Sequence, residues 1–147
     1  MDLKELYRDV ILDHNRSPRN FGRLDPADAT AVGRNPLCGD KLDVTLRMDG
    51  DRLADLRFEG QGCAISVASA SLMTEAVRGR SRAQIAQLYE AVHTLLTGRE
   101  RVAGEDLGKL LALAGVAEYP ARVKCASLSW HTLNAALDHI AVPVSTE

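Results

Sequence analysis

Apolar and polar residues alternate over two neighbouring stretches of the chain. In residues 42–48 every second position is apolar, and Leu56 and Phe58 continue the alternation within residues 53–58. A period of two places successive side chains on opposite faces of a strand, and the Asp49-Gly50-Asp51 sequence between the stretches is typical of a turn. The pattern predicts an antiparallel hairpin with one buried face. A shorter strand is expected around residues 29–32.

The remaining segments carry apolar residues at helical spacing. The first segment, from residue 3 to a break at 15–22, is predicted to be helical. Ser81 followed by Gln84 indicates the capped start of a helix, and Pro120 is typical of a first helical position. Further helices are predicted over residues 64–78, from 81 to about 97, over 105–114 and from 120 to about 140.

This order of elements predicts an α+β fold, with a small antiparallel three-stranded sheet packed against several helices. Residues 1–147 contain no repeat, linker or low-complexity run, so we expect a single domain. Residues 1–140 are expected to be ordered, and residues 141–147 to form a flexible tail.

Charge and cysteine usage narrow the class of protein. The chain has a formal net charge of −2, whereas a nucleic-acid-binding domain would show a basic stripe. No stretch reaches the roughly 20 consecutive apolar residues of a membrane span, and the acidic, amphipathic start does not resemble a secretory signal. The odd number of cysteines, 3, fits a reducing compartment in which thiols bind metal or react. We therefore expect a cytoplasmic protein without nucleic-acid or membrane partners.

The candidate chemistry lies in Cys38, Asp40, Cys63 and Cys125. Three thiolates and one carboxylate supply the four ligands of a tetrahedral zinc site, and the same thiolates form an incomplete set for an iron–sulfur cluster. The spacing is too wide for a zinc finger, which uses closely spaced cysteine pairs. Spacing alone therefore leaves open that the cysteines are small buried hydrophobic residues.

The local sequence around these residues favours reactive thiolates. Cys63 immediately precedes a predicted helix, and Cys125 is expected in about the first turn of the last helix. Backbone N–H groups at a helix start favour a thiolate over a thiol. Cys38 is expected on a loop, with Asp40 two residues later directed into the same space. All four ligands are expected to be exposed at the ends of elements.

Five sequence strings together resemble the IscU/SufU family of iron–sulfur cluster assembly proteins. The resemblance covers about residues 3–137 and is carried by residues 17–22 (SPRNFG), 35–40 (NPLCGD), 57–66 (RFEGQGCAIS), 68–73 (ASASLM) and 122–125 (RVKC). The chain resembles the SufU branch, because Lys124 stands where the IscU branch has histidine and the segment between Cys63 and Cys125 is of the longer SufU kind.

The resemblance implies that Cys38, Asp40, Cys63 and Cys125 match the zinc ligands of the family, and that the cysteines are also its candidate cluster ligands. It implies a pyridoxal-phosphate cysteine desulfurase as sulfur donor, and downstream cluster-assembly or apo-proteins as recipients. The expected activity is zinc-dependent sulfur transfer. The alternatives are a scaffold carrying a transient iron–sulfur cluster and a purely structural zinc. Cys38 is the expected sulfur acceptor, because its loop can move while Cys63 and Cys125 are anchored at helices.

Overall fold

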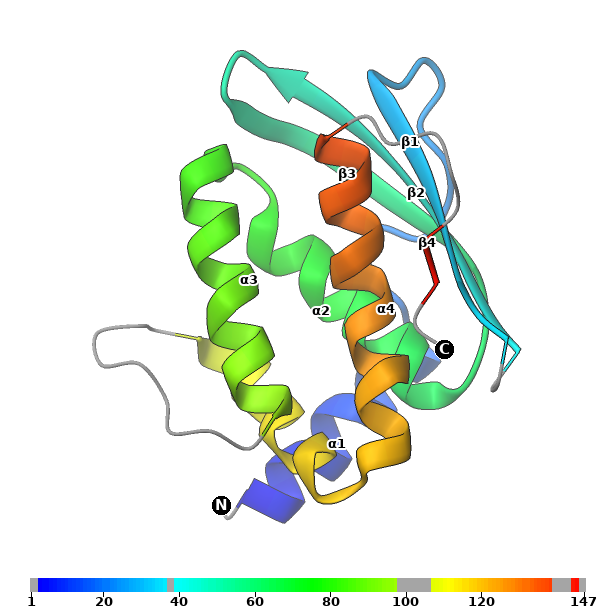
Figure 1. The fold of residues 1–147 in the computed structure, drawn as a ribbon, viewed down its shortest axis with the longest axis vertical. Helices are drawn as coiled ribbons and strands as arrows, with labels where there is room; N and C mark the ends of the chain where they lie inside the picture. Colours follow the sequence, from blue (N-terminus) through cyan, green and yellow to red (C-terminus); the bar gives the residue numbers. More distant parts are fainter. Residues whose placement is uncertain (1–2, 37–38, 98–106, 139–143, 146–147) are drawn as a thin grey trace.

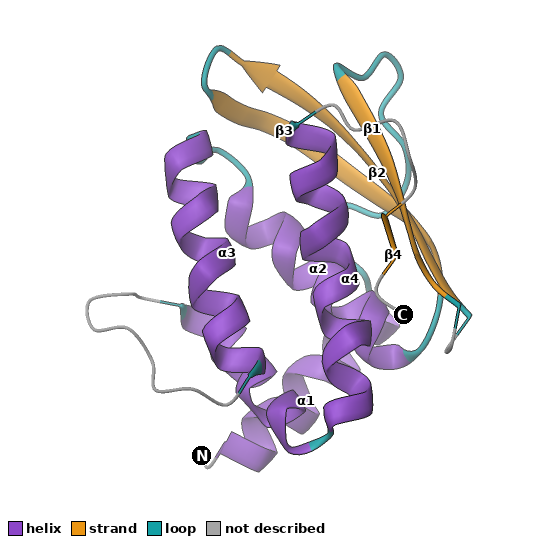
Figure 2. Ribbon diagram, viewed as in Figure 1, coloured by secondary structure: helices purple, strands orange, loops and turns teal. Residues whose placement is uncertain are grey.

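The predicted α+β architecture is confirmed. The computed structural model describes residues 3–36, 39–97, 107–138 and 144–145. Figure 1 shows the elements in chain order, and Figure 2 shows the helices gathered on one side of the sheet. The elements are α1 (Leu3–Arg16), β1 (Ala29–Asn35), β2 (Asp40–Asp49), β3 (Arg52–Gln61), α2 (Ala64–Val77), α3 (Arg82–Leu96), the 3₁₀-helix η1 (Gly108–Glu118), α4 (Pro120–Leu137) and β4 (Val144–Ser145).

The sheet has the order β3-β2-β1-β4 and is built around the predicted hairpin. β2 pairs antiparallel with both β1 and β3, so the three-stranded antiparallel sheet is confirmed. Leu42, Val44 and Leu46 are buried on its inner face, as the alternation predicts. The two residues of β4 pair in parallel with β1, where the sequence predicts a tail without regular structure. Whether residues 141–147 are flexible stays a prediction.

Small side chains allow α2 and α4 to approach each other and the sheet closely. Ser69 of α2 donates a hydrogen bond to the carbonyl of Ala126 in α4 (2.6 Å) and accepts one from the Trp130 indole (3.3 Å). A Cβ on Gly33 of β1 would meet the hydroxyl of Thr132 in α4. Trp130 is buried. These contacts fix α4 against the sheet, and α4 carries Cys125.

The segment before α4 differs from the prediction. The sequence predicts an α-helix over residues 105–114 closed by Gly115, whereas the structure has a 3₁₀-helix from Gly108 to Glu118, and residues 105–106 lie outside the described residues. Three residues per turn place side chains at i and i+3 above one another. Four buried residues follow that spacing, namely Leu107, Leu110, Leu113 and Val116, and Ala112 is buried beside them. Gly115 does not end the helix; a Cβ there would press on the ring of Tyr7.

None of the helices in the described part of the chain combines the length and the apolar character that crossing a membrane requires.

A buried histidine joins the end of α1 to α2. His14 is fully buried, and its Nδ1 lies 2.7 Å from the Ser71 hydroxyl. Ser71 also accepts a hydrogen bond from the backbone N–H of Arg19 (2.8 Å), so one hydroxyl links α1, α2 and the segment that follows α1. Nε2 of His14 lies 3.6 Å from a carboxylate oxygen of Glu75.

Acidification is expected to weaken the fold at His14. Burial, helped by Arg19 and Lys109, lowers the pKa of His14, while Glu75 and Asp13 oppose the shift. Since the folded protein keeps this ring neutral, its contribution to stability is fully present above the unfolded pKa of about 6.5 and is lost as the pH falls through that value towards the folded pKa. The slope from this group is at most about 1.4 kcal/mol per pH unit.

The measurement is urea unfolding from pH 7.5 downwards, with the same zinc loading in each protein. His14→Asn keeps a polar atom near Nδ1 but cannot take up the proton, so its free energy of unfolding should fall less steeply with acid than that of the wild type. His93→Asn, at an exposed histidine, is the control. Equal slopes for wild type and His14→Asn would contradict the expectation.

Candidate metal centre

Asp40 is the first residue of β2 and is 2% exposed. It stands opposite Asn35, the last residue of β1, so the two strand ends hold both ends of the loop between them. Asp40 Oδ1 accepts a hydrogen bond from the backbone N–H of Cys63 (2.8 Å). Its other oxygen, Oδ2, lies 3.9 Å from Cys63 Sγ. One carboxylate oxygen therefore orients the side chain, and the second faces the thiol.

Cys63 is the N-cap residue of α2, as the sequence predicts. Its backbone is extended (φ −68°, ψ 164°), and its sulfur accepts a hydrogen bond from the Ser66 N–H (3.5 Å). A capping side chain at this position faces the unpaired N–H groups and the positive end of the helix dipole. The Cys63 side chain is half-buried.

Cys125 lies deeper in its helix than predicted. α4 begins at Pro120, so Cys125 is its sixth residue, in the second turn. Its sulfur lies 4.0 Å from the Ala121 carbonyl of the preceding turn and 3.9 Å from Asn35 Nδ2. The helix dipole acts mainly within the first turn, so it acts less on Cys125 than on Cys63 at its N-cap position. Cys125 is fully buried.

The structure brings Asp40, Cys63 and Cys125 together. One ligand atom from each lies within 4.8 Å of the other two. The expectation that all ligands are exposed is wrong, since Asp40 and Cys125 are buried and only Cys63 is half-buried. Cys63 caps the start of α2 and Cys125 lies in the N-terminal half of α4, and Asp40 begins β2, so the three residues come from the ends of three elements. In Figure 1 both helices begin at the end of the molecule where α1 lies. Cys38 lies outside the described residues.

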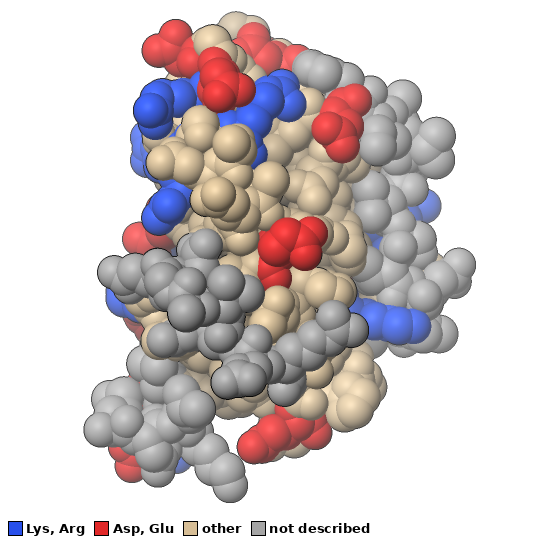
Figure 3. All heavy atoms as spheres, turned by 60° about the vertical axis from the view of Figure 1, so that its left-hand side comes forward, with Lys and Arg blue, Asp and Glu red and all other residues tan. Residues whose placement is uncertain are grey.

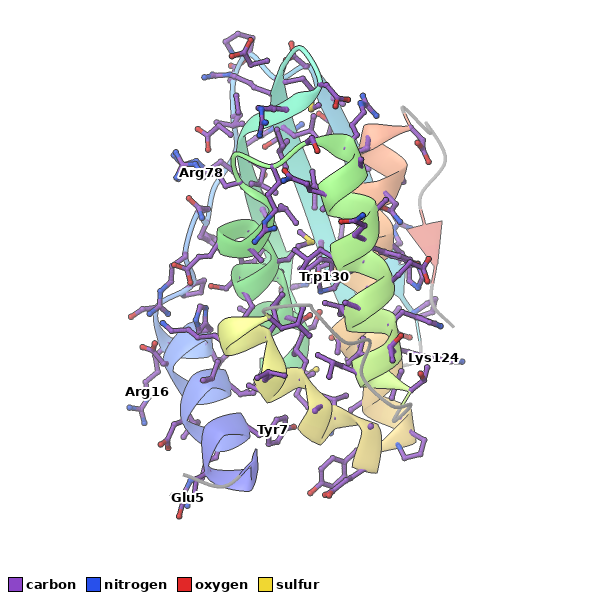
Figure 4. The ribbon with its side chains drawn as sticks, turned by 90° about the vertical axis from the view of Figure 1, so that its left-hand side faces the viewer. Glu5, Tyr7, Arg16, Arg78, Lys124 and Trp130 are labelled. Atoms are coloured by element: carbon purple, nitrogen blue, oxygen red, sulfur yellow. The ribbon has the colours of Figure 1, made fainter. Side chains whose placement is uncertain are left out.

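Two side chains near the centre shape its electrostatics. The Cys63 thiolate, and then the hydrogen bond and negative charge of Cys125, raise the pKa of Arg122 above its ordinary value, so this exposed guanidinium faces both sulfurs. Tyr7 points from α1 towards η1 (Figure 4). Its partial burial raises its pKa, and the negative charge that Tyr119 would carry when ionised raises it further. Lys124 lies on the outer side of α4 (Figure 4). Arg122 therefore places a positive charge beside Cys63 and Cys125.

Sequence reasoning missed Asn35 as a neighbour of the centre. Asn35 is 1% exposed, its Nδ2 faces Cys125 Sγ, and its Oδ1 is buried without a hydrogen-bond partner among the described residues. Its only sequence signal is its place three residues before Cys38. His131 is no part of the centre, since its Nδ1 bonds the Tyr89 hydroxyl (2.7 Å).

The donor set fits a zinc ion. Two thiolates on one zinc ion are at most about 4.6 Å apart, twice the Zn–S bond length, and the spread of up to 4.8 Å needs only small side-chain rotations. Asp40 keeps one oxygen free for an ion while the other is held by a backbone N–H, an outer bond typical of metal ligands. A fourth ligand would complete tetrahedral coordination.

Gly62 is required for the position of the Asp40 carboxylate. A Cβ at residue 62 would lie 2.5 Å from Asp40 Oδ1 and 3.0 Å from its Cγ. Gly62→Ala should therefore displace the carboxylate and lower zinc affinity by about 10- to 100-fold, the cost typical of disturbing a ligand's outer contacts. Competition with a chromophoric chelator measures the affinity. Gln61→Ala, at the exposed neighbouring position, is the control. Unchanged zinc affinity in Gly62→Ala would show that the Asp40 carboxylate does not bind the metal from its present position.

The chain is similar in sequence and fold to known proteins. The model of the NifU-like N-terminal domain family matches residues 6–126. The chain is 43% identical to the zinc-dependent sulfurtransferase SufU of Bacillus subtilis over 90% of its length and 89% of the relative. It is 40% identical to the iron–sulfur cluster assembly scaffold protein IscU of Streptococcus pyogenes, over 92% and 84% of the two chains.

A solved structure supports the same assignment. The crystal structure of a candidate iron–sulfur cluster assembly scaffold protein for the SUF system, from Fervidobacterium islandicum, is 33% identical with a TM-score of 0.83, covering 90% of this chain and 97% of the other. The chain therefore belongs to the NifU-like N-terminal domain family, among the SufU- and IscU-type iron–sulfur cluster assembly proteins.

Proposed function

We propose that the protein is a zinc-dependent sulfurtransferase of iron–sulfur cluster assembly, which accepts persulfide sulfur from a pyridoxal-phosphate cysteine desulfurase. The observation that supports this most directly is the convergence of Asp40, Cys63 and Cys125 on one small volume. The similarity to a relative named for zinc-dependent sulfur transfer points the same way.

In this proposal Cys38, Asp40, Cys63 and Cys125 hold the zinc ion. Cys38 is two positions before Asp40, so chain connectivity keeps it within reach of the same ion. Bound zinc supplies positive charge that keeps its thiol ligands deprotonated at neutral pH. The protein positions the remaining charges: the Cys63 N–H orients Asp40, and Arg122 faces Cys63 and Cys125 and stabilises them as thiolates.

Burial separates the roles of the thiols. Attack on a persulfide requires an accessible thiolate. Cys125 is fully buried, and the Cys63 sulfur is held by Ser66, so both are suited to anchoring. We therefore assign sulfur acceptance to Cys38. Its thiolate attacks the outer sulfur of the donor's persulfide; the new S–S bond forms as the donor's S–S bond breaks, and the donor leaves as a thiolate. No external oxidant or reductant is needed.

A second candidate function is a scaffold on which an iron–sulfur cluster is assembled as cargo for apo-proteins. The same buried thiols are cluster ligands by type, and the 40% identical relative from Streptococcus pyogenes is named as such a scaffold. Asp40 favours the first function, because carboxylate oxygen is a common zinc ligand whereas clusters are usually held by thiolates.

One experiment tests the proposal. The full chain is purified without added metal, its zinc, iron and labile sulfide are measured, and its effect on sulfide release by a cysteine desulfurase is followed. Zinc at about one ion per chain together with stimulation of the desulfurase is the expected result. A brown protein with labile sulfide would replace the proposal by the scaffold, and bound zinc without stimulation would leave the ion a structural role.

A further inference from the structure

Three arginines gather at the end of the molecule far from the metal centre. Arg52 follows the β2–β3 turn, and Arg80 and Arg82 flank Ser81, which forms a β-bridge with Arg52. We call these three residues the arginine cluster. β2 runs 10 residues from Asp40 at the metal centre to Asp49 beside the cluster, which at about 3.4 Å per residue separates the two by about 30 Å. Figure 3 shows basic side chains gathered near this end of the molecule.

The backbone beneath the arginine cluster is held rigidly. Leu53 donates a hydrogen bond to the carbonyl of Arg80 (2.9 Å) and accepts one from the N–H of Gly79 (2.7 Å). The N–H of Arg82 donates to the carbonyl of Asp51 (3.0 Å). These bonds tie the turn between α2 and α3 to the start of β3. Side chains carried on this turn therefore start from fixed Cα positions.

The guanidinium groups are also positioned, and no carboxylate of the described residues pairs with their charges. Each donates one hydrogen bond to a backbone carbonyl: Arg52 Nη1 to Gly79 (3.1 Å), Arg80 Nε to Ala76 (2.6 Å) and Arg82 Nη1 to Leu137 (2.8 Å). A guanidinium has five N–H donors, so most remain available. Within the described residues no carboxylate forms an ion pair with the cluster, whereas the neighbouring Arg57 and Arg78 share Asp55.

We infer that the arginine cluster is a docking surface for an acidic segment of a partner protein. Guanidinium groups bind carboxylates through paired N–H donors, and their fixed positions reduce the entropy lost on binding. A nucleic acid fits less well, because nucleic-acid-binding domains carry a long basic stripe, whereas here Asp49 and Asp51 flank the cluster and confine the basic charge to two short turns. An acidic segment short enough to contact only the three arginines avoids these carboxylates. A partner bound here would leave the metal centre uncovered. The inference does not depend on sulfur transfer.

The test uses the full ¹⁵N-labelled chain and an octaglutamate peptide, followed by NMR at low salt. We expect saturable shifts of backbone amides in residues 51–53 and 78–82, weakened when salt screens the charges. The triple variant Arg52→Gln, Arg80→Gln, Arg82→Gln should bind about tenfold more weakly, as expected for the loss of several surface ion pairs. The matched control replaces the exposed Arg8, Arg16 and Arg34 by glutamine and should bind like the wild type.

Three results would overturn the inference. They are shifts spread over the surface instead of these two turns, an equal loss of affinity in the control variant, and tighter binding of an eight-nucleotide DNA strand than of octaglutamate at the same amides. The wild-type titration decides the first and third even if Arg82, which caps the last carbonyls of α4, proves necessary for folding.

Discussion

Replacement of Cys38 by serine is expected to reduce persulfide acceptance to background while the fold persists. A thiolate is the attacking group in sulfur transfer, and a serine hydroxyl stays protonated and unreactive towards a persulfide. We expect the other two thiols not to substitute, because Cys125 is fully buried and the half-buried Cys63 caps α2 through Ser66. The measurement is transfer of ³⁵S from labelled cysteine through a desulfurase, with the modified residue mapped by mass spectrometry after alkylation.

The fold and the zinc content of Cys38→Ser are measured as controls. Circular dichroism should resemble that of the wild type, since none of the described core residues is changed. The zinc content and the melting temperature should fall only as far as the loss of one zinc ligand requires. Substitution of Asn35 by aspartate, a buried neighbour of Cys125, is a useful comparison: it alters the centre without removing the proposed acceptor. Persulfide found on Cys63 or Cys125 in Cys38→Ser would show that the acceptor assignment is wrong.

Local patterns predicted the elements well where one side-chain period dominated. The alternation in residues 42–48 and 53–58 identified the hairpin because one sheet face is buried. The Ser81–Gln84 capping box and the Pro120 helix start are both present in the structure. The 3₁₀-helix was missed because a three-residue spacing of leucines was interpreted as an α-helical pattern, and the two periods differ little over a short segment.

The sequence predicted which residues form the centre, but not how deeply they are buried or which side chains surround them. Residue types and a family resemblance identified Asp40, Cys63 and Cys125, which fold together. Their burial was not predictable, since it depends on contacts between segments far apart in the sequence, such as that of Asp40 with Cys63 and that of Asn35 with Cys125. The direction of Arg122 towards both sulfurs likewise depends on where α4 lies against α2. Periodicity carries information on local faces and none on such convergence.

Replacement of Cys125 by serine is expected to lower zinc affinity by about 100-fold or more. Loss of a contact outside the ligand set already costs 10- to 100-fold, and Cys125 supplies a sulfur within 4.8 Å of the other two ligand atoms. Serine at this buried site offers a neutral hydroxyl in place of a thiolate, so one strong ligand and one negative charge are lost together. Competition with a chromophoric chelator at constant pH measures the change, because zinc binding releases protons from thiols.

Ser129→Ala is the matched control for Cys125→Ser. Ser129 lies one turn further along α4, is fully buried, and its hydroxyl has no partner among the described residues, so its removal leaves the centre untouched. Both substitutions are small changes inside one helix, and a general loosening of α4 would lower zinc affinity in both. A loss confined to Cys125→Ser therefore identifies a ligand. Wild-type affinity in Cys125→Ser would instead make Cys125 a small buried hydrophobic residue, and the convergence of the three side chains a consequence of packing.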